Sequence, residues 1–75
     1  MAEAPGGPVK RSIAVAGHRT SISLEEEFWS ALAAAAAVRG VSVAALVAGI
    51  DAGRGGRNLS SAVRVFLLNE ARGRT

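Results

Sequence analysis

The alternation of apolar and polar residues from position 19 onward is the clearest pattern in this chain. Residues 19–24 alternate with a period of two, which is typical of a strand with one buried face. The apolar side holds Thr20, Ile22 and Leu24, and the polar side holds Arg19, Ser21 and Ser23. From Phe28 the apolar residues recur at helical spacing, and after Gly40 a second helical pattern begins. The segment therefore predicts a strand followed by two helices.

A second alternating stretch, residues 12–16, precedes this strand. The glycine–histidine pair at 17–18 suits the centre of a type II′ turn, which has glycine first. Pairing Ala16 with Arg19 then sets the apolar residues of both strands on one side. One continuous strand is the alternative, and it would divide those residues between two faces unless the glycine formed a bulge. We favour a hairpin with strands at 12–16 and 19–23.

The first helix is predicted over residues 25–39. Ser23 and Glu26 have the spacing of a capping box, in which each side chain accepts a hydrogen bond from the backbone N–H of the other residue. Residues 25–27 are all glutamate and lie at the positive end of the helix dipole, so we assign them to capping and solubility and not to acid–base catalysis. The expected inward face consists of Phe28, Leu32, Ala35 and Ala36, with Trp29 beside it.

The second helix is predicted over residues 42–52. Gly40 suits the left-handed residue that ends the first helix, and Ser42 suits the N-cap of the next. The buried stripe of this helix is expected to be Val43, Leu46, Val47 and Ile50.

A third helix is predicted over residues 58–71, after a flexible loop at 53–57. Asn58 is its expected N-cap. Its buried stripe is expected to be Leu59, Ala62, Val63, Phe66 and Leu67. Val65 and Leu68 leave apolar surface off that stripe, which favours an intertwined dimer or a protein partner.

Length and composition limit what the chain can be. Its 75 residues suit one small domain, and a monomer of this size is marginal unless something reinforces it. The absence of cysteine and the single histidine argue against disulfides and a zinc site, so oligomerisation is the expected reinforcement. The formal net charge of +3 and the sequence pI near 11.2 favour a polyanionic partner.

Several classes of protein are not expected. Residues 1–9 and 72–75 should be disordered tails, and the N-terminus has neither a secretory nor a transit pattern. No apolar run reaches the length of a membrane span, so we expect a cytoplasmic protein without a membrane contact. No acid–base pair, activated nucleophile or metal-ligand spacing is visible, so we expect neither an enzyme nor a cofactor.

The strand, the helix, the Gly-x-Ser turn and the second helix over residues 19–50 resemble the ribbon–helix–helix family of small dimeric DNA-binding proteins, which includes repressors and antitoxins. The resemblance implies a mainly α fold with a short β ribbon, built as an intertwined homodimer. This chain would add a third helix and, where the hairpin forms, an extra N-terminal strand. In that family one strand from each subunit pairs across the two-fold axis, and the ribbon enters the major groove, which a two-stranded ribbon fits.

Carried over to this sequence, the resemblance assigns base contacts to Arg19, Ser21 and Ser23. The start of the second helix would hold a DNA phosphate through the backbone N–H groups of Val41, Ser42 and Val43, an arrangement that the helix dipole favours. Lys10 and Arg11 could contact phosphates as a basic arm, the alternative being a solvated chain end. The expected dimer core is Ile22, Leu24, Phe28, Trp29, Leu32, Leu46, Val47 and Ile50.

Two functions follow from these expectations. The first is a homodimeric, sequence-specific protein that binds double-stranded DNA and acts as a transcriptional repressor. The second is a dimeric adaptor or antitoxin-like module that binds a protein partner through the Val65 and Leu68 face of the third helix. The salt dependence of DNA affinity distinguishes the two functions, because phosphate contacts release counterions.

Overall fold

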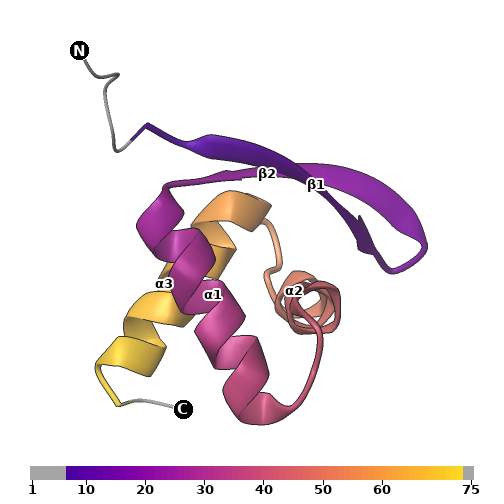
Figure 1. The fold of residues 1–75 in the computed structure, drawn as a ribbon. Coiled ribbons are helices and arrows are strands. Elements are labelled where there is room, and N and C mark those ends of the chain that lie inside the picture. The colour runs from indigo at the N-terminus through magenta and orange to yellow at the C-terminus, as the bar shows by residue number, and fades with distance from the viewer. Residues whose placement is uncertain (1–6, 74–75) are drawn as a thin grey trace.

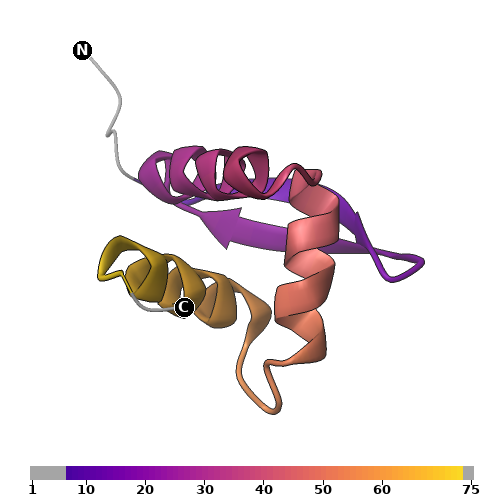
Figure 2. The ribbon, with the colours of Figure 1, turned by 90° about the horizontal axis from the view of Figure 1, so that it is seen from below.

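The computed structural model describes residues 7–73 as a two-stranded hairpin over three helices. The elements are β1 (Val9–Val15), β2 (His18–Leu24), α1 (Glu26–Arg39), α2 (Val43–Ala52) and α3 (Leu59–Ala71). The ribbon forms one layer and the helices form the other, with α2 beneath the half of the ribbon that is nearer the turn (Figure 1). The tip of the hairpin projects past α2 in both views (Figures 1 and 2), and the side of the ribbon away from the helices is uncovered.

The hairpin that we favoured is present, but its turn differs from the predicted one. The turn residues are Ala16 and Gly17, and both have positive φ, 51° and 85°, as a type I′ turn requires. Val15 therefore pairs with His18, and the register is displaced by two residues from the predicted pairing. Because side chains alternate with a period of two, this displacement leaves every side chain on its predicted face.

β1 begins earlier than predicted. Val9 lies opposite Leu24 and Arg11 lies opposite Ile22, so the ribbon continues into the stretch that was expected to be a disordered tail. The predicted strand limits of 12–16 and 19–23 are wrong at both ends, because in the observed register the strands pair along seven residues, from Val9 opposite Leu24 to Val15 opposite His18. Residues 1–6 and 74–75 of the predicted tails lie outside the described residues.

Local hydrogen bonds set most helix ends as the sequence predicts. Gly40 ends α1 with φ 70°, and the Ser42 side chain caps α2 by accepting a hydrogen bond from the Ala45 N–H. The Asn58 side chain caps α3 in the same way, accepting from the Ser61 N–H. These three predictions are confirmed.

The predicted capping box at the start of α1 is wrong. The N-cap is Glu25, whose side chain makes no capping hydrogen bond, and Ser23 still belongs to β2. The reason is tertiary, because Leu24 is fully buried at the end of the paired strand. Leu24 keeps its extended conformation because its side chain packs in the core, so α1 begins only after this residue.

The core lies between the ribbon and the helices of one chain. Its buried members are Val15, Ile22, Leu24, Trp29, Leu32, Ala36, Leu46, Val47, Val63 and Leu67. Six of the eight residues predicted for a dimer core belong to this cluster and are buried within one chain. The other two, Phe28 and Ile50, are partly buried against it and keep part of their surface exposed.

Among the described residues no single helix is long and apolar enough to cross a membrane. α1 and α2 reach that length and composition only when they are taken together, and they are bent by 95° at Gly40–Ser42.

Candidate nucleic-acid interface

The outer face of the ribbon is the face that turns away from the helices. The register places Lys10 beside Ser23, Ser12 beside Ser21, and Ala14 beside Arg19 on this face. Ser23 is half-buried and the other five residues are exposed. The three predicted base-contacting residues therefore share one face with Lys10. Ser12, which the sequence analysis did not assign, joins them, and strand alternation on β1 was the signal that could have identified it.

The outer face has dimensions that suit a DNA groove. Paired strands lie about 4.8 Å apart, and the major groove is about 12 Å wide, so the groove admits this ribbon. Lys10 and Arg19 are four residue levels apart in the register, roughly 13 Å along the ribbon. The Arg19 Nη1 donates a hydrogen bond to the Ser12 Oγ at 3.2 Å, which draws the guanidinium over the middle of the face.

Ion pairs account for most of the other arginines. The pairs are Arg11 with Glu26, Arg39 with Glu70, Arg54 with Asp51, and Arg64 with Glu25. Within residues 7–73 the basic side chains outside these pairs are Lys10, Arg19, Arg57 and Arg72, and the remaining acidic side chain is Glu27. Two of the unpaired cations stand on the outer face, which carries no carboxylate. The outer face thus holds half of the unpaired cations within residues 7–73 and no opposing charge.

Arg11 does not belong to the predicted basic arm. It pairs with Ile22 and so lies on the side of β1 that faces the helices. Its guanidinium carbon is 4.8 Å from the centre of the Trp29 ring, and its Nη2 is 3.4 Å from the Glu26 Oε2. Stacking and ion pairing direct this charge to α1. Lys10, on the opposite face of the strand, remains a candidate for a phosphate contact.

The backbone of Ser23 is held by α3. Its N–H donates to the Ser60 Oγ at 3.4 Å, and its carbonyl oxygen accepts from the Arg64 Nη2 at 3.4 Å. Arg64 also donates to the Glu25 Oε1, from Nε at 3.3 Å and from Nη2 at 3.2 Å. These bonds occupy the free edge of β2 at Ser23, so a strand from another molecule cannot pair at this residue.

The carboxyl group of Glu25 has a pKa below its ordinary value of 4.5. The largest cause is a hydrogen bond from its own backbone N–H, and desolvation acts in the opposite direction. The hydrogen bond from Arg64 and its positive charge lower the pKa further. Glu25 is therefore ionised at neutral pH, and it neutralises Arg64 beside the ribbon.

The start of α2 does not share a surface with the outer face. The Val41 N–H donates to the Ala36 carbonyl at 3.1 Å, so this predicted phosphate donor is already satisfied. Ser42 and Val43 remain the candidates at this helix N-terminus. Since α2 lies beneath the ribbon, on the side away from the outer face (Figures 1 and 2), one chain does not present both predicted DNA contacts together.

In the part of the chain that the structure describes, no group of three histidine, aspartate or glutamate residues lies close enough to hold a metal ion.

The family comparison covers most of the chain. A family model described as a ribbon-helix-helix domain matches residues 8–71, a span that includes β2, all three helices and all of β1. Comparison with curated proteins and with solved structures found no match. The matched span extends beyond the resemblance at residues 19–50, so the hairpin and the third helix belong to the domain.

Proposed function

Since the chain belongs to the ribbon–helix–helix family, we propose that it binds double-stranded DNA by inserting the β1–β2 ribbon into the major groove. The outer face would lie against the base edges. Both strands come from one chain, so a single chain carries a complete two-stranded ribbon. The ribbon implied by the family resemblance differs in origin, because two subunits would contribute one strand each.

The observation that carries the proposal is the charge of the outer face. Lys10 and Arg19 stand there without an acidic partner among residues 7–73, whereas Arg11, Arg39, Arg54 and Arg64 are neutralised elsewhere. Arg19 can donate two hydrogen bonds to one guanine, and the hydroxyl groups of Ser12 and Ser21 can bond to several base edges. Lys10, at the far end of the ribbon, suits a phosphate. Ser23 is the weaker base contact because it is half-buried.

We further propose that the DNA-binding form is a homodimer and that it represses transcription by occupying its site. The core is complete within one chain, so the dimer requires a separate seam. Val38 is 86% exposed on α1 and adjoins a groove of about 290 Å³ between α1 and α3. That groove is lined by alanines of α1 together with Leu67 and Ala71. Small side chains allow close approach of a second copy. A charged glutamate at position 38 would oppose that approach, so Val38→Glu should shift the mass measured by light scattering from dimer to monomer.

The test of DNA binding is an anisotropy titration of labelled random duplex at about 50 and about 200 mM salt. Lys10→Ala should weaken binding on all sequences and should reduce the slope of log affinity against log salt concentration by about one for each ribbon that is bound. Arg19→Ala should weaken binding about tenfold and remove a guanine preference at one position in a selection from random duplexes. Arg72→Ala is the matched control, because it removes an unpaired arginine that lies away from the ribbon.

Two results would contradict the proposal. One is an affinity for duplex DNA that does not change with salt. The other is equal loss of affinity in Arg72→Ala and in Arg19→Ala, since that result would indicate a nonspecific effect of charge. Circular dichroism of each variant establishes that the fold is retained.

A further inference from the structure

A second surface on the helical layer combines apolar side chains with unpaired cations. On α3, Val65, Leu68, Asn69 and Arg72 have the spacing i, i+3, i+4, i+7, which places them on one helix face. We call these four residues the α3 strip. Val65 is 36% exposed and Leu68 is 50% exposed, so the apolar part of the strip is partly open to solvent.

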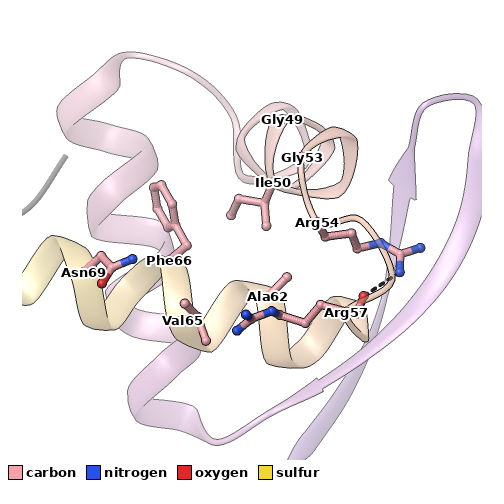
Figure 3. Close-up of a pocket in the computed structure, with 9 residues that line it drawn as sticks. All are labelled: Gly49, Ile50, Gly53, Arg54, Arg57, Ala62, Val65, Phe66 and Asn69. Atoms are coloured by element: carbon pink, nitrogen blue, oxygen red, sulfur yellow. Dashed lines mark hydrogen bonds between the residues drawn. The ribbon is translucent and has the colours of Figure 1, made fainter.

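A groove of about 380 Å³ between α2 and α3 adjoins the α3 strip. Figure 3 shows Ile50 projecting from α2 toward α3, which contributes Ala62 and Phe66 to the lining of this α2–α3 groove. Val65 and Asn69 line the groove and also belong to the α3 strip, so the two surfaces are continuous. The groove is therefore large enough for an apolar side chain of a partner and opens directly onto further apolar surface.

The charges around the groove and the strip are positive. Figure 3 shows the Arg57 side chain extending along α3 toward Val65, and Arg72 lies at the other end of the helix. Neither arginine has an acidic partner among residues 7–73, whereas Arg54 is held by Asp51 and by the Arg57 carbonyl. α3 has 13 residues, so the two cations bracket the strip over roughly 20 Å.

We propose that the α2–α3 groove and the α3 strip bind an acidic amphipathic helix of a partner protein. One apolar side chain of that helix would enter the groove between Ile50 and Phe66, and another would cover Leu68. Carboxylates at its two ends would pair with Arg57 and Arg72. A helix that docks in an apolar groove presents its own anchors at i, i+3, i+4 and i+7, so the partner helix would carry its apolar side chains at that spacing.

Charge complementarity favours this occupant over two others. A second copy of the chain offers a single unpaired carboxylate, Glu27, within residues 7–73, whereas the surface has two unpaired cations. DNA would satisfy the cations but would leave Val65 and Leu68 in water. The proposal does not depend on DNA binding by the ribbon, because the surface belongs to the helical layer.

The test uses a display library of 18-residue helical peptides, randomised on one face and selected on the full chain. The enriched peptides should carry an apolar i, i+3 or i+4, i+7 stripe flanked by aspartate or glutamate. Arg57→Glu combined with Arg72→Glu should weaken the best peptide about tenfold, and lysine in place of the peptide carboxylates should restore binding to that variant. Leu68→Ser should also weaken it, while Lys10→Ala combined with Arg19→Ala should not.

Several outcomes would overturn the proposal. These are selection without enrichment, enriched peptides that lack acidic residues, and peptide affinity unchanged in the Arg57→Glu, Arg72→Glu variant. A change of that variant from dimer to monomer would assign the surface to a second copy. A loss of DNA affinity as large as that of Lys10→Ala with Arg19→Ala would assign the surface to DNA. Thermal unfolding establishes that each variant is folded.

Discussion

Arg64 of α3 contacts Glu25 at the junction of β2 and α1, with its Nη2 3.2 Å from the Glu25 Oε1. The same guanidinium donates to the carbonyl oxygen of Ser23 and lies 5.7 Å from the centre of the Phe28 ring. One side chain thus ties the third helix to the strand that carries the proposed base contacts. The third helix is therefore part of the support of the ribbon.

Replacing Arg64 by methionine should loosen this junction. The arginine side chain is 34% exposed and its partner carboxylate 30% exposed, so solvent screens the ion pair, and the effect should be moderate. We expect the midpoint of thermal unfolding to fall by about 5 °C. Arg57→Met is the control and should change the midpoint little. Equal midpoints for the two variants would show that the Arg64 contacts do not stabilise the fold.

The stability supplied by Glu25 should depend on pH. Its folded pKa is lowered, so the ionised carboxylate stabilises the folded chain fully above the ordinary value of 4.5, and this contribution is lost as the pH falls through the folded pKa. The difference in unfolding midpoint between the wild type and Glu25→Gln should be constant from neutral pH down to about pH 5 and should shrink in more acidic solution. Glu27→Gln, which alters an unpaired carboxylate, is the control. A difference that persists unchanged at about pH 3 would refute the assignment.

Ala16 carries backbone strain in the turn of the hairpin. Its φ of 51° is one that alanine adopts at a cost, whereas asparagine before glycine is the preferred pair for a type I′ turn. Ala16→Asn should raise the free energy of unfolding by about 0.5–1 kcal/mol, measured by urea denaturation. Gly17→Ala, at φ 85°, should lower it by a similar amount. A destabilised Ala16→Asn variant would contradict the turn assignment.

Trp29 anchors the beginning of β1. Its indole Nε1 donates to the Val9 carbonyl at 2.9 Å, and its ring stacks under Arg11. Trp29→Phe removes that hydrogen bond and should cost about 1–2 kcal/mol of stability. Amide exchange at Lys10–Ser12 should accelerate more than exchange in α2. Val63→Ala is the control, since it should destabilise the whole fold without this preference for β1, and uniform acceleration in Trp29→Phe would argue against an anchoring role.

The sequence determined the features that depend on neighbouring residues. Ser42 and Asn58 cap their helices because a side-chain oxygen reaches an N–H three residues later, and this geometry is local. Strand alternation likewise assigned Arg19 and Ile22 to opposite faces, an assignment that the displaced register did not alter. The order of the strands and helices followed from these same short-range patterns.

Only the tertiary structure decided which charged side chains form ion pairs and which remain unpaired among residues 7–73. Arg11 and Glu26 are 15 residues apart, and Arg64 and Glu25 are 39 residues apart, so no local pattern indicates that they pair. The same holds for the core, since Val15 of the hairpin and Val63 of the third helix pack with Leu32 of the first helix although they are far apart in the sequence. Charge and burial depend on the packing of distant segments, whereas caps and side-chain alternation depend on the chain immediately around each residue.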